Sequence, residues 1–212
     1  MPLNIRLIVS RPFDQNTYIV WLEGRRDALV IDPGLDPEAI LDCLGEEALT
    51  PAAILNTHGH ADHIAGNDAM KKAHPDAPLL IGEGDAPMLA DARLNLSAFF
   101  GTPLTSPPAD RLLKDGERFE FAGIALEVRL IPGHSPGHVV FVHDGPPVRV
   151  FGGDVLFAGG IGRTDFPGGS HEQLLAGIRE RLFTLPPGAE VYPGHGPDTT
   201  VGEESSSNPF LA

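Results

Sequence analysis

The chain contains one cysteine, Cys43, among its 212 residues, so no disulfide can form within it. A lone cysteine fits a reducing compartment, and it could in principle act as a catalytic thiol. Cys43 lies, however, in a short apolar-periodic stretch, residues 38–44, where a small buried side chain is expected. We therefore predict a structural role for Cys43.

Basic residues are scarce. The chain has 15 lysines and arginines against 29 aspartates and glutamates, which gives a formal net charge of −14. Binding of nucleic acid depends on clustered basic side chains that neutralise phosphates. This acidic balance, without a basic arm, argues against nucleic acid as a partner.

Long apolar runs are also absent. No run approaches the roughly 18 residues that a membrane-spanning helix needs. Residues 1–6 show no basic segment followed by an apolar stretch, as a signal peptide would. We therefore expect no membrane partner and a cytoplasmic location. An apolar content of 42% is that of an ordinary globular protein, and the length predicts a single domain over residues 1–212.

Turn formers are plentiful, with 25 glycines and 21 prolines separating short apolar runs. These runs predict strands at 3–9, 17–23, 28–31, 53–56, 78–81, 117–121, 124–131, 139–142, 148–151 and 190–192. Helices are predicted after Pro37 and at 63–74, 84–100 and 170–183, with a Pro-rich candidate hinge at 102–108 and a Gly-rich loop at 152–169. Strands in two groups, each followed by helices, predict an α+β fold with two face-to-face sheets and helices outside.

Four potential metal ligands lie within H-G-H-A-D-H, directly after a predicted buried strand. They are His58, His60, Asp62 and His63. Neither a regular strand nor a helix could place all four side chains on one face. A tight turn that enters a helix can bring them together, and Gly59 leaves room for such a turn.

Three more potential ligands, His134, Asp154 and His195, each end a predicted strand and follow a glycine. Loops at strand ends often gather at one edge of a sheet and form functional sites. Seven nitrogen and oxygen ligands exceed the four of one structural zinc, so the sequence predicts two metals with open positions. His138 either lines this site or hydrogen-bonds a loop carbonyl, and we favour the structural role.

These motifs resemble those of the metallo-β-lactamase fold superfamily nearly end to end. The matching stretches are T-H-G-H-A-D-H (57–63), P-G-H-S-P-G-H (132–138), F-G-G-D (151–154) and Y-P-G-H (192–195). Residues from Gly160 to Gly169 and the tail S-N-P-F (207–210) are similar to short bacterial glyoxalase II-like hydrolases. The resemblance implies a four-layer αββα sandwich with the metal site at the edge between the two sheets.

The resemblance also assigns the ligands. His58, His60 and His134 would hold the first metal, and Asp62, His63 and His195 the second. Asp154 would bridge both metals, so Asp62 and Asp154 are the implied catalytic carboxylates. Asp32 would steady the metal loops from behind the ligands. The implied cofactors are two divalent metal ions, with Zn²⁺ favoured and Fe or Mn as alternatives.

The implied activity is hydrolysis of a thioester by a metal-bridging hydroxide, with S-lactoylglutathione as the leading candidate substrate. Arg163 matches a basic residue that contacts glutathione in glyoxalase II, although a loop salt bridge would explain it equally well. The sequence departs from full-length glyoxalase II after His195. Those enzymes carry an added C-terminal helical region that helps to hold glutathione, whereas only residues 196–212 follow His195 here.

Two rival functions remain open. Persulfide dioxygenases of the same superfamily share the R-T-D-F stretch (163–166) and use one iron, for which His58, His134 and Asp154 would form a facial triad. Gly196-Pro197 after the last histidine favours the hydrolase. A non-catalytic binding protein is the second rival, disfavoured by the complete ligand set. Asp154, where some β-lactamases have a cysteine, disfavours a β-lactamase. Either a monomer or a homodimer is compatible with the sequence.

Overall fold

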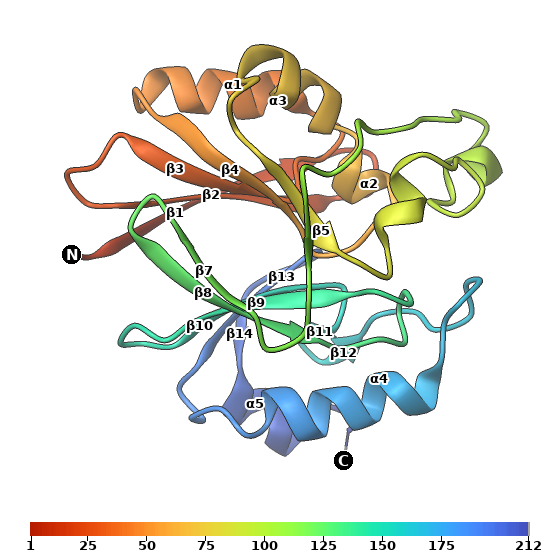
Figure 1. Ribbon diagram of the computed structural model, residues 1–212. Helices are drawn as coiled ribbons and strands as arrows, with labels where there is room; N and C mark the ends of the chain where they lie inside the picture. Colours follow the sequence, from red (N-terminus) through yellow and green to blue (C-terminus); the bar gives the residue numbers. More distant parts are fainter. Residues whose placement is uncertain (212) are drawn as a thin grey trace.

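Two six-stranded sheets pack face to face in the computed structural model, which describes residues 1–211 (Figure 1). The first sheet has the strand order β1 (Leu3–Ser10), β2 (Gln15–Leu22), β3 (Asp27–Ile31), β4 (Thr50–Asn56), β5 (Leu79–Gly82) and β6 (Arg111–Leu113). The second has the order β14 (Thr199–Thr200), β13 (Glu190–Pro193), β10 (Arg149–Gly153), β9 (Val139–His143), β8 (Ile124–Leu130) and β7 (Arg118–Phe121). A small hairpin of β11 (Leu156–Phe157) and β12 (Gly160–Ile161) follows β10.

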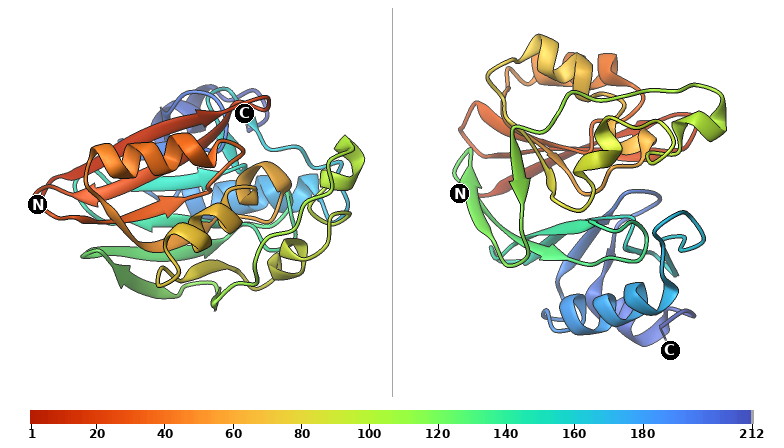
Figure 2. Two further views of the ribbon diagram at one scale, coloured as in Figure 1. Left: turned by 90° about the horizontal axis from the view of Figure 1, so that it is seen from above. Right: turned by 45° about the vertical axis from the view of Figure 1, so that its right-hand side comes forward.

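Helices cover the outer faces of both sheets. The first sheet is covered by α1 (Pro37–Glu46) and α3 (Asn67–Ala73), and the second by α4 (His171–Gly177) and α5 (Val201–Ser207) (Figures 1 and 2). A short helix, α2 (Ala61–Ile64), follows β4, and a π-helical turn, η3 (Ile178–Leu182), extends α4. The predicted αββα sandwich is confirmed. Within residues 1–211, no helix is long and apolar enough to cross a membrane.

Alternation of side chains along the central strands explains the four layers. In β2, Tyr18 and Val20 pack into the core between the two sheets, whereas Ile19 packs into the core beneath α1 and α3. Because both faces are buried, such strands carry near-continuous apolar runs rather than an alternating pattern. Asp36 caps α1 by accepting a hydrogen bond from the backbone N–H of Ala39, and Pro37 opens the helix as predicted.

The helix predicted at 84–100 is wrong. Only two 3₁₀ turns form there, η1 (Ala86–Leu89) and η2 (Ser97–Phe100). Leu96 adopts a left-handed backbone conformation with φ +70°, which a helix cannot continue through. The Asn95 side chain also bonds to the backbone of the segment itself, so polar tertiary contacts replace the helical hydrogen bonds.

The hinge predicted at 102–108 is also misplaced. After this loop the chain adds β6 to the first sheet, parallel to β5, and it crosses to the second sheet only at residues 114–117. The helical pattern at 63–74 is divided between α2 and α3. The remaining predicted strands match the observed ones to within a few residues.

Candidate metal centre

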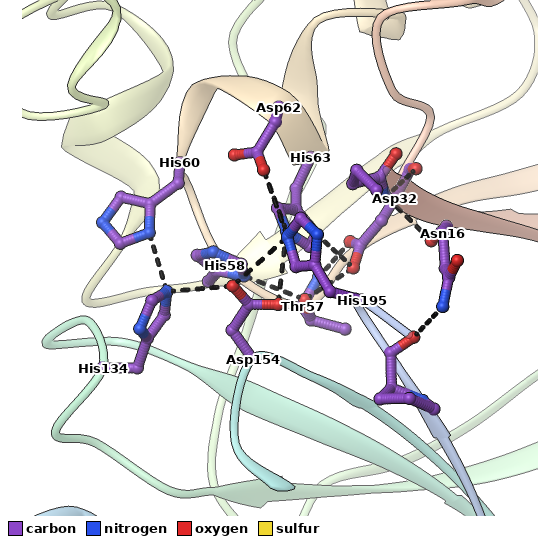
Figure 3. Close-up of polar contacts among 12 residues, drawn as sticks. Asn16, Asp32, Thr57, His58, His60, Asp62, His63, His134, Asp154 and His195 are labelled. Carbon is purple, nitrogen blue, oxygen red and sulfur yellow. Dashed lines mark hydrogen bonds and ion pairs between the residues drawn. The ribbon is translucent and has the colours of Figure 1, made fainter. Parts of the chain in front are cut away.

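All seven predicted ligands meet at one edge of the sandwich, between the ends of the two sheets (Figure 3). The first sheet contributes four of them, because His58 and His60 directly follow β4 while Asp62 and His63 lie on α2. The others lie in loops of the second sheet, which end β8 (His134), β10 (Asp154) and β13 (His195).

Three histidines form a first group. The ligand atoms of His58, His60 and His134 all lie within 4.8 Å of one another. Nδ1 of His60 lies 2.9 Å from Nε2 of His134, and Nε2 of His58 is buried without a hydrogen-bond partner. Three nitrogens therefore point at one place, which is the arrangement that a tetrahedral metal requires with one position left open.

Asp62, His63 and His195 form a second group, also within 4.8 Å. Oδ2 of Asp62 lies 3.2 Å from Nε2 of His195 and 3.7 Å from Nε2 of His63. Asp154 lies between the two groups. One of its oxygens is 3.4 Å from Nε2 of His134, and the other is 3.4 Å from Nε2 of His63. A single carboxylate thus reaches both groups.

The outer nitrogens of three histidines are held by oxygen acceptors. Nδ1 of His134 donates to the carbonyl of Arg163 at 2.8 Å, and Nδ1 of His195 donates to the carbonyl of Phe13 at 3.0 Å. His63 donates through Nδ1 to Asp32 at 3.0 Å. These bonds fix the tautomers so that each Nε2 faces the centre, as metal-binding histidines generally require.

Asp32 positions the ligand His63 and the neighbouring Thr57 through hydrogen bonds. Its carboxylate accepts hydrogen bonds from the backbone N–H and the hydroxyl of Thr57, both at 2.7 Å, in addition to the one from His63. Asp32 also lies within 4.8 Å of the His58 and His63 ligand atoms. Because its oxygens already accept three hydrogen bonds, we assign it to positioning rather than to metal binding.

Burial and neighbouring charges shift the pKa values of the histidines and carboxylates in the centre. Burial lowers the pKa of His58 well below its usual value and that of His60 to about 3, so both rings are neutral and able to ligate. Burial alone would raise the pKa of Asp154, but the adjacent His63 lowers it well below its usual range. Burial alone would lower the pKa of His63, but Asp154 and Asp62 raise it well above the usual value.

These features fit a divalent metal pair. Nε2 of His58, Nε2 of His63 and Oδ1 of Asp154 are buried without hydrogen-bond partners, which is costly unless another group satisfies them. Imidazoles and carboxylates are suitable ligands for zinc, iron and manganese. In the metal-free protein, a proton on His63 offsets the charge of the surrounding carboxylates.

Metal affinity should therefore fall as the pH is lowered. The raised pKa of His63 favours the protonated ring in the metal-free protein, and a metal that binds Nε2 must displace that proton. Each displaced proton weakens binding about tenfold per pH unit below the pKa. Competition with a chromophoric chelator at pH 6, 7 and 8 measures this slope. An affinity independent of pH would show that His63 is not a ligand.

Glycines precede the three ligands that follow strands of the second sheet, and steric reasons account for them. A Cβ at position 194 would overlap the Asp154 carboxylate, so only glycine lets the His195 loop approach the centre. Gly153, before Asp154, has φ +48°, and a Cβ there would overlap Thr57. The close approach of backbone to ligand inferred from the sequence therefore applies to Gly194, whereas Gly153 is required by its left-handed backbone and its contact with Thr57.

Asp85 is a supporting residue that the sequence analysis missed. Its fully buried carboxylate accepts hydrogen bonds from the N–H of Gly59, the hydroxyl of Ser135 and the N–H of Gly137, at 3.0, 2.6 and 2.5 Å. It therefore joins the loop of His58 and His60 to the loop of His134. Burial raises the pKa of Asp85 despite these three donors. Its position in the turn after β5, three residues beyond Gly82, was the available signal.

His138 is structural, as predicted, but not through a loop carbonyl. It is completely buried, and its Nε2 accepts the backbone N–H of Asp154 at 3.0 Å. Its ring also stacks on His58, with centroids 4.7 Å apart. His138 thus positions one ligand through the backbone and packs against another.

Both the backbone and the side chain of Arg163 lie at the site. Its carbonyl orients His134, and its side chain lines the cavity above the centre. The guanidinium, however, forms two hydrogen bonds with Asp165, at 3.0 and 2.8 Å, and lies 4.3 Å above the Phe166 ring. The loop salt bridge considered from the sequence is therefore present, and a role in substrate binding stays a prediction.

The fold and the ligand motifs place the chain in a known class. The family model of the metallo-beta-lactamase superfamily matches residues 10–195, and the chain belongs to this superfamily. Over 94% of its length it is 42% identical to the probable metallo-hydrolase YqgX of Bacillus subtilis, covering 93% of that protein. It is 36% identical to the hydroxyacylglutathione hydrolase GloC of Haemophilus influenzae, covering 99% of this chain and 98% of the relative.

A redox enzyme is nearly as similar. The mitochondrial persulfide dioxygenase ETHE1 of Bos taurus is 34% identical over 92% of the chain and 70% of that protein. Among solved structures, the B3 metallo-beta-lactamase BLEG-1 matches with a TM-score of 0.94 and 39% identity, covering 99% and 100% of the two chains. TTHA1623, solved in a di-iron-bound form, matches with a TM-score of 0.86 and 38% identity, covering 97% and 100%.

Proposed function

We propose that the protein is a dinuclear metal-dependent hydrolase that cleaves S-lactoylglutathione or a related acyl thioester. The observation that carries this proposal is the position of Asp154, which lies between two groups of three ligands and contacts both. The similarity to GloC over nearly the whole of both chains supports a glutathione thioester as the first substrate to test.

Each group of ligands has a role in this proposal. His58, His60 and His134 would hold one ion, Asp62, His63 and His195 the other, and Asp154 both. When bound, two divalent ions would lower the pKa of a water molecule and polarise the thioester carbonyl. Zn²⁺ suits the nitrogen and oxygen donors, and the di-iron form of TTHA1623 makes iron the main alternative.

Asp62 is the residue best placed to handle a proton. Its carboxylate lines the cavity, its side chain is 20% exposed, and it lies 3.2 Å from His195. Burial opposes its ionisation, but His63 lowers the pKa of Asp62, so it is ionised at neutral pH. In hydrolysis the acyl carbon–sulfur bond breaks, the water oxygen joins the acyl carbon, and Asp62 can pass the released proton towards the departing sulfur.

Other activities of the superfamily have specific support. Similarity to ETHE1 favours oxidation of a persulfide at one iron, which His58, His134 and Asp154 would hold. The close match to BLEG-1 makes a β-lactam a required test substrate, although Asp154 stands where some β-lactamases have a cysteine. We favour thioester hydrolysis because a single iron held by His58, His134 and Asp154 would not use Asp62 or His195 as a ligand.

Metal analysis combined with a substrate panel distinguishes these functions. The panel contains S-lactoylglutathione, simple acyl thioesters, a lactone, a β-lactam and glutathione persulfide. We expect two metals per chain and turnover of thioesters without oxygen consumption. One iron per chain with oxygen uptake on the persulfide would establish the dioxygenase instead. A protein that binds no metal at neutral pH would exclude both.

Substitution of Cys43 should leave catalysis intact. Cys43 lies on α1 and packs against the core between this helix and the first sheet, where it is half-buried rather than fully buried as expected. Burial raises the pKa of its thiol, so it is a poor nucleophile. We expect Cys43→Ser to keep wild-type kcat and KM for thioesters. A folded variant without turnover would revive a thiol mechanism.

A further inference from the structure

Phenylalanines surround the candidate metal centre. A cavity of about 350 Å³ opens above the ligands, and its apolar lining consists mainly of Phe13, Leu96, Phe100, Phe157 and Phe166. These side chains come from separate segments: the β1–β2 turn, η2, β11 and the loop before α4. None of them belongs to the three apolar cores of the described chain. Their position is therefore not explained by packing of the sheets and helices.

Two of the rings contact the metal ligands directly. The Phe166 centroid lies 5.6 Å from that of His60 and 6.4 Å from that of His134. On the other side, the Phe157 centroid lies 6.2 Å from that of His195. A phenylalanine ring therefore lies beside each group of ligands.

The other two rings meet over the cavity. Phe13 and Phe100 pack edge to face with centroids 5.3 Å apart, although they are 41% and 58% exposed. When exposed aromatic rings line a cavity, an apolar ligand that covers them removes their apolar surface from water, which is favourable. The backbone carbonyl of Phe13 accepts a hydrogen bond from Nδ1 of His195, so the backbone that carries this ring is positioned relative to the centre.

The cavity offers few polar groups beyond the ligands themselves. The Asn95 side chain already has hydrogen-bond partners within the protein. Its NH₂ donates to the carbonyls of Met88 and Leu104, and its oxygen accepts from Ser97. Arg163, the one cation among the described lining residues, is paired with Asp165. A glutathione arm carries two carboxylates, and no unpaired Lys or Arg among the described lining residues is present to hold them.

We propose that the substrate is a thioester with an apolar arm, aliphatic or aromatic, which lies among Phe13, Phe100, Phe157 and Phe166. This inference rests on the proposed thioester hydrolysis. It makes the phenylalanines specificity-determining residues and ranks apolar acyl thioesters above S-lactoylglutathione. Each buried methylene should raise kcat/KM about three- to fourfold, and partial burial should give at least about tenfold between hexanoyl and acetyl groups.

The kinetic test compares thioesters that share one neutral thiol. S-hexanoyl- and S-phenylacetyl-N-acetylcysteamine are compared with the acetyl and lactoyl forms. S-benzyl thioacetate, an ester of a second neutral thiol, is tested separately to place the apolar group on the thiol side. Phe100→Ala should lower the ratio of kcat/KM for the apolar substrates to kcat/KM for the acetyl form about tenfold. Phe99→Ala is the matched control, because Phe99 is 71% exposed and does not line the cavity.

Equilibrium binding keeps the test independent of catalysis. Calorimetry of the metal-loaded protein with hexanoate, phenylacetate and lactate should give at least tenfold tighter binding of the two apolar acids. Phe100→Ala should remove that difference and Phe99→Ala should keep it. If no thioester is cleaved, the proposed function fails, while this binding result still decides the apolar subsite.

Two results would overturn the inference. Equal affinity and equal kcat/KM for apolar and polar arms would show that the rings do not select substrate. A wild-type dimer that Phe100→Ala converts to a monomer in sedimentation would show that a second copy of the chain covers the rings instead.

Discussion

Replacement of Asp154 with alanine should abolish thioester turnover while the sandwich stays folded. Among residues 1–211, Asp154 is the one carboxylate that contacts both groups of ligands. It follows β10, and its own side chain belongs to none of the three apolar cores, although the next residue, Val155, packs in one of them. Substitution of residues that only support metal ligands costs about 10–100-fold, so loss of the shared ligand should exceed about 100-fold. Circular dichroism, metal analysis and turnover of S-lactoylglutathione and S-hexanoyl-N-acetylcysteamine measure the three effects.

Asp198→Ala is a suitable control for this variant. Asp198 is an exposed carboxylate three residues beyond His195 and lies outside the cavity lining, so its loss removes the same charge without a ligand. We expect it to retain two metals and wild-type turnover. Wild-type turnover by Asp154→Ala would rule out the dinuclear mechanism.

Asp85→Ala should have the largest effect on stability. It removes the acceptor for three donors from Gly59, Ser135 and Gly137, which lie around a fully buried carboxylate. An unsatisfied buried donor costs about 1–3 kcal/mol, whereas removal of the carboxylate recovers part of its own desolvation cost. We therefore expect the free energy of unfolding to fall by about 2–4 kcal/mol, and metal affinity by about 10–100-fold.

Urea unfolding of the metal-free protein separates this effect from lost metal binding. Asp85→Asn keeps one acceptor oxygen and should be intermediate, because its amide NH₂ faces a second donor. Asp76→Ala, at an exposed position without a described hydrogen bond, should stay within about 0.5 kcal/mol of wild type. Stability of Asp85→Ala equal to that of Asp76→Ala would contradict the role given to Asp85.

Local chemistry explains how much of the fold could be predicted. Strands such as β2 and β4 are apolar on both faces and end at turn formers, so their residues indicate them without knowledge of their neighbours. The segment 84–100 contains enough apolar residues to suggest a helix. Its conformation instead depends on the side-chain hydrogen bonds of Asn95, which run to nearby backbone groups, and on those of Asp85, whose partners Ser135 and Gly137 are distant in the sequence. An apolar pattern does not reveal either set of contacts.

The sequence by itself identified the seven candidate ligands, because H-G-H-A-D-H lies in six consecutive residues and His134, Asp154 and His195 each follow a predicted strand. Only the tertiary structure decided that Asp154 contacts both groups, that Asp85 links two loops and that Phe13 meets Phe100. The reason is physical. Ligand identity is a property of single side chains, whereas support and substrate selection depend on distances between segments that the packing of two sheets alone establishes.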